Sequence, residues 1–184
     1  MNELRIGEPA RFLAAFILAA VAGAAQAQHQ PYAGQHERDI KALSAEAVKQ
    51  YLDGAGMGYA KAAELNQYPG PAHALELAER LGLTPAQRAA TKQLMDAHRA
   101  EARAIGAKLV ESERALEVLF RRGQVDQTQL AAAVHHAGSL QGEYRLSHLE
   151  THRRLRTVLT DEQVARYDQL RGYASGGGHH QGPR

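Results

Sequence analysis

The sequence predicts an all-α fold built around one long antiparallel helical hairpin, with short flanking helices packed along it. Apolar residues make up 44% of the chain, and alanine and leucine, which both favour helix, supply most of them. Aromatic residues make up only 5%, and runs of β-branched residues are nearly absent, so we expect no strand. Two long segments contain almost no glycine or proline and repeat apolar residues in steps of four and three. The 184 residues are enough for one such domain.

The frame Leu-Thr-x-x-Gln occurs twice, at positions 83–87 and 159–163. Each copy predicts a capping box, in which a threonine at the N-cap and a glutamine three residues later exchange hydrogen bonds with each other's backbone. The capping residues are Thr84, Gln87, Thr160 and Gln163. The repeated frame therefore marks two helix starts.

The two arms of the hairpin are expected at residues 85–122 and 127–158. Gly123 ends the first arm and Asp126 caps the second, and so short a link makes two long helices fold back antiparallel. The apolar stripe on each arm is too long and thin for the hairpin alone to bury. We expect the short helices to cover part of it and a second copy of the chain, in a homodimer, to cover the rest.

Shorter helices are expected within residues 44–54, 59–66, 71–82 and 161–171. The first begins near a capping serine and should bury one face, made of Ala47, Val48, Tyr51 and Leu52. The folded domain is thus expected to span residues 44–173, preceded by a flexible segment at 28–43 and followed by a disordered, Gly- and His-rich tail at 174–184.

Residues 1–27 are typical of a secretory signal peptide. An apolar run from Phe12 to Ala25 precedes a small-x-small site at Ala25 to Ala27, which predicts cleavage before Gln28. An uncleaved membrane anchor is the alternative. The chain has no cysteine, which excludes disulfides and thiol catalysis and suits an oxidising compartment. We therefore expect a periplasmic protein.

The charge pattern and the motifs exclude several classes of function. The formal net charge is only +2 and basic residues alternate with acidic ones, so we expect no nucleic-acid partner. No nucleophile elbow occurs, and no glycine-rich loop follows a strand, so we do not expect an enzyme.

The ten histidines suggest a metal site within the hairpin. With the turn centred near Gly123, antiparallel arms place His148 beside His98, and His152 lies one turn further along the same face. Three imidazoles with a carboxylate could hold a divalent zinc, nickel, cobalt or copper ion. The alternative is a polar seam in which His98 and His148 only hydrogen-bond across the helix pair and His152 faces solvent.

Two further sites are weaker candidates. His179 and His180 in the tail could bind metal loosely, or could simply be solvated. At the tip of the hairpin, apolar side chains beside cations could bind unfolded proteins or a partner, or could close the end of the core. This tip surface consists of Val118, Phe120, Arg121 and Arg122.

With its secretory signal, helical composition, lack of cysteine and two LTxxQ frames, the chain resembles the Spy/CpxP family of periplasmic stress proteins. The stretches AELNQYPGPAHALELAERLGLTPAQ and HLETHRRLRTVLTDEQVARYDQLRGY look closest to its heavy-metal-resistance branch, which includes ZraP- and CnrX-like proteins. The resemblance covers roughly residues 51–173. It implies an intertwined homodimer of helical hairpins, with ATP-independent chaperone activity or with metal sensing and buffering in the envelope.

The same resemblance bears on the metal ligands. CnrX-like sensors draw ligands from His-x-x-x-His and His-x-x-x-Met pairs and a glutamate, and here only His148 and His152 form such a pair. His73 and Glu64 are the possible substitutes for the missing ligands, and a ZraP-like histidine tail is matched loosely by His179 and His180.

We therefore expect a periplasmic heavy-metal-binding stress protein with chaperone-like character. Two alternatives stay open: a metal-independent holdase for unfolded envelope proteins, and a regulatory partner of a membrane-bound sensor kinase or anti-sigma factor.

Overall fold

The computed structural model describes residues 32–123 and 125–173, and within these ranges the fold is all-α with no strand, as predicted. The chain divides into two units, Met1–His36 and Glu37–Arg184, and the α-helices belong to the second. Residues 32–36, the described part of the first unit, form a turn and begin the 3-10 helix η1 (Gln35–Glu37). The expected signal peptide and the histidine tail lie outside the described residues. Within the described ranges, no helix is both long and apolar enough to cross a membrane.

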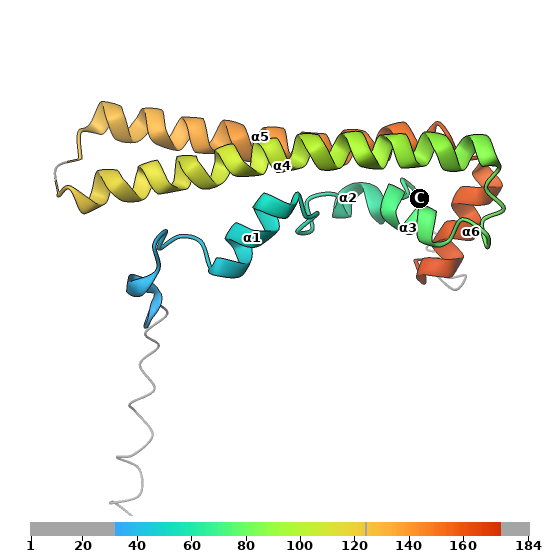
Figure 1. Ribbon diagram of the computed structural model, residues 1–184, viewed down its shortest axis with the longest axis horizontal. Coiled ribbons are helices and arrows are strands. Elements are labelled where there is room, and N and C mark those ends of the chain that lie inside the picture. The colour runs from blue at the N-terminus through green and yellow to red at the C-terminus, as the bar shows by residue number, and fades with distance from the viewer. Residues whose placement is uncertain (1–31, 124, 174–184) are drawn as a thin grey trace, which may run out of the picture. The chain divides into compact units, whose positions relative to one another are not determined.

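The hairpin is formed by α4 (Pro85–Arg121) and α5 (Gln127–Arg156), which lie side by side (Figure 1). Helix α4 has 37 residues and is therefore about 55 Å long at 1.5 Å per residue. The predicted caps are present, because Thr84 forms a complete capping box and the Asp126 side chain accepts hydrogen bonds from two backbone amides of α5. Helix α5 ends two residues before the predicted Val158, where the chain turns to bury Leu159.

Three short helices follow one another along one side of this hairpin: α1 (Ala45–Asp53), α2 (Lys61–Glu64) and α3 (Pro71–Glu76) (Figure 1). The last helix, α6 (Asp161–Arg171), follows the end of α5 and begins with the second capping box. Helix α2 is shorter than predicted. Gln67 after it adopts a left-handed backbone with φ of 67°, and Pro69 follows, so the helix cannot continue.

Gly106 allows α1 to approach α4 closely. A Cβ atom at this glycine would lie 2.0 Å from the carbonyl oxygen of Tyr51. Tyr51 is buried as predicted, but Leu52 is 46% exposed and its predicted place in the buried face is wrong. The reason is that α1 contacts α4 at Tyr51, which lies against Gly106. Leu52, the next residue of the helix, is turned away from this contact.

Apolar side chains gather in two separate clusters. The first joins α3 and the turn after it to the end of α5 and to α6, through Ala74, Ala78, Leu81, Leu83, Leu155, Leu159, Val164 and Tyr167. The second joins α1 to the middle of the hairpin, through Ile40, Tyr51, Ala102, Leu109, Val110, Leu140 and Tyr144. On α4 and α5, the segments between these clusters carry His98 and His148.

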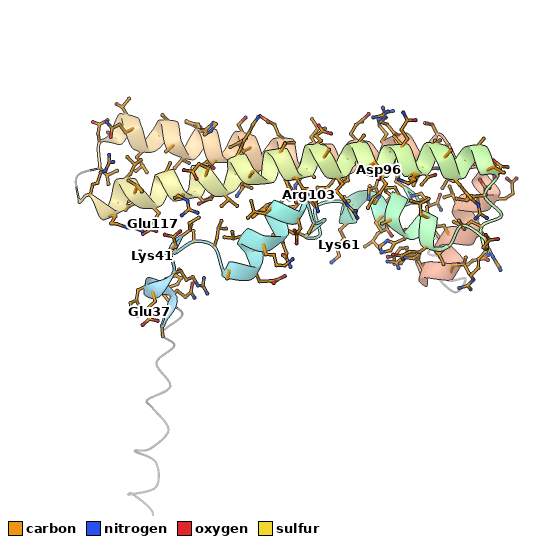
Figure 2. The ribbon with its side chains drawn as sticks, viewed as in Figure 1. Glu37, Lys41, Lys61, Asp96, Arg103 and Glu117 are labelled. Carbon is orange, nitrogen blue, oxygen red and sulfur yellow. The ribbon has the colours of Figure 1, made fainter. Side chains whose placement is uncertain are left out.

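The core extends into the segment that was predicted to be flexible. Ile40 is only 3% exposed and belongs to the second cluster. Lys41 Nζ bonds Glu117 Oε1 of α4 at 2.5 Å, and both residues are labelled in Figure 2. Nearer the start of α4, Arg103 Nε donates to the carbonyl of Asp53 at 3.3 Å, which satisfies an orphan acceptor at the end of α1.

Candidate functional site

His98 of α4 and His148 of α5 face each other across the hairpin, as the predicted register requires. His98 Nε2 lies 3.0 Å from His148 Nδ1, and the ring centroids are 4.4 Å apart at an angle of 74°. His148 is only 3% exposed. The two outer nitrogens, His98 Nδ1 and His148 Nε2, are buried and have no hydrogen-bond partner among the described residues. One hydrogen bond therefore serves both the buried ring of His148 and the half-buried ring of His98, which leaves two buried nitrogens unsatisfied.

Burial keeps this pair neutral. It lowers the pKa of His148 to about 4, with further contributions from the neighbouring His98 and His152. Burial, followed by the charge of His152, also lowers the pKa of His98. Neutral imidazoles carry the lone pairs that bind metal ions, so the pair is ready to act as a ligand at neutral pH.

His152 lies one turn further along α5 and is oriented by a backbone carbonyl. Its Nδ1 is 2.8 Å from the carbonyl oxygen of Tyr68, which can only accept, so Nδ1 carries the proton. The lone pair of the neutral ring is then on Nε2. Metal-bound histidines are usually held in this way, with the second ring nitrogen donating to a carbonyl.

Glu64 supplies a carboxylate beside His152. Its Oε2 is 3.6 Å from His152 Nδ1 and its Oε1 is 3.6 Å from His73 Nδ1. Tyr167 of α6 donates its hydroxyl to Glu64 Oε1 at 2.6 Å. Burial, and then this hydrogen bond, raise the pKa of Tyr167, so the tyrosine stays protonated and fixes the carboxylate.

Gly70 packs closely against both His152 and Glu64. A Cβ atom there would lie 3.3 Å from His152 Nε2 and 3.1 Å from Glu64 Oε2. These residues line a pocket of about 490 Å³ between the α1–α2 loop, α3 and the hairpin. The five predicted hairpin and substitute ligands all line this pocket: Glu64, His73, His98, His148 and His152.

As they stand, no three His, Asp or Glu side chains in the described ranges are grouped closely enough to hold a metal ion. The pocket instead holds two subsets. His98 and His148 form one, and Glu64, His73 and His152 form the other. His179 and His180 lie outside the described residues.

The predicted tip surface is found at the far end of the hairpin. Phe120 is 58% exposed, Arg121 and Arg122 are exposed, and Val118 is half-buried. Arg121 Nη2 also donates to the carbonyl of Asp39 at 3.2 Å, so this cation is engaged by the segment before α1. Binding of a client or partner at this tip stays a prediction.

Several residues that line the pocket or orient its ligands were not found from the sequence. Tyr68 and Tyr167 orient His152 and Glu64, and they come from a loop and from a helix distant in sequence. Met57 and Met95 also line the pocket. The stretch from Glu64 to His73 was singled out only through the family resemblance, and its tyrosine and glycine carried no separate pattern.

The two LTxxQ frames are both capping boxes, as predicted. A model of LTXXQ motif family proteins matches residues 72–171, more than half of the chain, and supports the resemblance to Spy/CpxP-type proteins. No curated protein matches the chain, and no solved structure does. The family match suggests a periplasmic protein of the stress or chaperone type. The chain therefore belongs to the LTXXQ motif family.

Proposed function

We propose that this protein is a periplasmic stress protein that binds a divalent transition metal in the hairpin pocket and has chaperone character. The observation that carries the proposal is the buried His98–His148 pair, whose outer nitrogens have no partner, beside the oriented ring of His152. A buried polar group without a partner costs free energy, and a ligand that accepts its lone pair removes that cost.

The donor set fits a divalent ion of the zinc, nickel, cobalt or copper class. In the hydrogen bond between His98 Nε2 and His148 Nδ1 one ring donates and the other accepts, so the outer nitrogen of the donating ring keeps a free lone pair for a metal ion. His152 Nε2 and the Glu64 carboxylate line the same pocket. His98, His148 and His152 would hold the ion, with Glu64 and His73 as the further candidates.

Metal binding would act on the fold because the ligands come from different elements. His98 lies on α4, His148 and His152 on α5, and Glu64 on α2. An ion shared between these helices would stabilise their native arrangement by mass action. It would thereby change how readily apolar surface near the pocket becomes available to an unfolded client.

Calorimetric titration of the full chain with zinc and nickel tests the proposal. The histidines at 179 and 180 are first replaced by glutamine, so that the tail does not contribute. We expect His148→Gln/His152→Gln to abolish stoichiometric binding. The matched control is His135→Gln/His136→Gln, which removes two exposed histidines from the same helix and should leave binding intact.

Unchanged binding in the pocket variant would refute the metal proposal. Suppression of client aggregation that is equally strong with and without a chelator would then favour the metal-independent holdase. Co-purification with a sensor kinase or anti-sigma factor would instead favour the regulatory partner.

The periplasmic location is tested separately by fractionating cells that express the full chain. We expect the mature protein in the periplasmic fraction, with an N-terminus at Gln28. A membrane-bound chain that retains residues 1–27 would indicate an anchor instead.

A further inference from the structure

The sulfur atoms of this chain are concentrated at the pocket. The sequence has three methionines and no cysteine, and the methionines after Met1 are Met57 and Met95. Both line the same pocket as His98 and His148. Both methionines that follow Met1 therefore line the same pocket as the imidazoles of His98 and His148.

Met95 is placed next to the histidine pair by the geometry of α4. It precedes His98 by three residues, and residues three apart lie on the same face of a helix. Met95 is half-buried, whereas Asp96 and Ala97 between it and His98 are exposed. The thioether therefore belongs to the pocket side of α4.

Met57 occupies an unusual backbone position in the glycine-rich α1–α2 loop. Its φ is 46°, and in the described ranges Gln67 is the only other non-glycine residue with positive φ. Glycine would adopt this conformation without steric cost, and glycine is the residue on both sides of Met57. The loop thus holds a methionine where the backbone favours glycine, and this methionine is one of the residues that line the pocket.

These methionines do not pack in the apolar core. Among the described residues, neither Met57 nor Met95 belongs to either apolar cluster. Met57 is 37% exposed. Methionine often fills gaps in a core, but here both side chains border open space instead.

Thioether sulfur is a soft, neutral ligand that favours copper(I), whereas imidazole and carboxylate suit zinc and nickel. We propose that the pocket binds a soft monovalent ion, copper(I), through Met57 and Met95 together with an unpartnered nitrogen of His98 or His148. This inference rests on the same pocket as the proposed metal-binding function and adds a soft monovalent ion to the divalent ions proposed there. Glu64, His73 and His152, which supply oxygen and nitrogen donors, form the other part of the pocket.

The test compares copper(I) and zinc on the full chain with the tail histidines replaced. Copper(I) affinity is measured without oxygen, in competition with a chromophoric chelator. We expect Met57→Leu/Met95→Leu to weaken copper(I) binding at least tenfold and to change zinc binding less than twofold. Leucine has about the same volume as methionine, and the two residues are equally strained at the positive φ of position 57. The substitutions should therefore change the stability of the fold little.

A matched control shows whether position or sulfur content matters. Leu65 is 52% exposed and does not line the pocket, so Leu65→Met in the double-leucine chain should not restore copper(I) binding. Methyl NMR of the methionines gives a readout independent of affinity. Silver(I), a surrogate that does not undergo redox chemistry here, should shift the Met57 and Met95 methyl resonances.

The outcomes separate the two proposals. Copper(I) affinity that is equal in wild type and in the double-leucine variant, with unshifted methyl resonances, would overturn the sulfur site even if zinc still binds through His148 and His152. Binding of neither ion would refute both proposals. Copper(I) binding with shifted methyls but without zinc binding would support the sulfur site and refute the divalent one.

Discussion

Gln87 and Gln163, the last residues of the two LTxxQ frames, hydrogen-bond each other in both directions through their side-chain amides. Gln87 Nε2 donates to Gln163 Oε1 at 2.8 Å, and Gln163 Nε2 donates to Gln87 Oε1 at 3.0 Å. Each oxygen also accepts from the backbone amide of its own threonine cap. The repeated frame therefore does more than start two helices, because it joins the two starts to each other.

We expect Gln163→Glu to destabilise the fold by about 2 kcal/mol, because a carboxylate removes a donor and faces the oxygen of Gln87. Loss of an ordinary cap, as in Thr160→Ala, should cost about 1 kcal/mol. Urea unfolding followed by circular dichroism measures both. Gln141→Glu, on the exposed side of α5, is the control, and an equal effect there would contradict the role of the pair.

Replacing Gly106 should destabilise the fold, although glycine is a poor helix former in the interior of a long helix. Gly106→Ala pushes a methyl group onto the Tyr51 carbonyl, and overpacking of this kind costs about 1–3 kcal/mol. Gly142 of α5 has nothing within 4 Å of its ideal Cβ position, so Gly142→Ala should instead stabilise the helix by roughly 0.5–1 kcal/mol. Thermal unfolding of the two variants should give shifts of opposite sign. Shifts of the same sign would show that α1 does not press on α4 at this point.

The buried histidines should make the metal-free fold sensitive to acid. The pKa of His148 is lowered to about 4 by burial, followed by the effects of His98 and His152, against an ordinary value of 6.5. The unfolded chain therefore binds this proton more readily, and the contribution to stability is complete above about pH 6.5 and is lost as pH falls toward about 4. We expect this group to account for a loss of roughly 3 kcal/mol at most.

This expectation is checked by urea unfolding with chelator present, from about pH 7 down to about pH 4.5. The difference in the free energy of unfolding between wild type and His148→Gln should shrink as the pH falls. His135→Gln removes an exposed histidine from the same helix and should run parallel to wild type. A constant difference between wild type and His148→Gln would show that His148 does not titrate in this range.

Gly70→Ala should weaken zinc binding without unfolding the protein. Alanine can adopt its backbone conformation, with φ of −85° and ψ of 140°, but the new methyl group would press on both His152 and Glu64. We expect affinity to fall about tenfold or more, the size of effect seen when groups around a metal site are disturbed. Gly56→Ala changes a pocket glycine with nothing within 4 Å of its ideal Cβ, and calorimetry should find it neutral. Equal affinities in the two variants would place the zinc elsewhere.

The hairpin was predictable because its determinants are local. Capping residues, the absence of helix breakers and a link containing Gly123 define two long antiparallel helices, and their register then brings His98 to His148. The pairing of Gln87 with Gln163 was not predictable, because a capping box explains each frame completely without the other. The exposure of Leu52 was not predictable either, because it depends on the contact between α1 and Gly106.

The candidate site was predictable only in part for a similar reason. Helical spacing identifies His148 and His152, but the groups that orient the site reach it from loops and from α6. Tyr68 orients His152 through its backbone carbonyl, which any residue could supply. Tyr167 orients Glu64 through its hydroxyl, from a position 103 residues away in the sequence. The expected homodimer and the metal stay predictions.

The separation of the two apolar clusters by a polar stretch has a consequence for how the molecule opens. The buried groups between the clusters, at His98 and His148, are polar and do not continue either apolar cluster, so we expect each end of the hairpin to open as its own cooperative unit. Hydrogen exchange should then show two blocks of amides with different opening free energies. A ligand bound between the two clusters would then determine how strongly the opening of one block is coupled to the opening of the other.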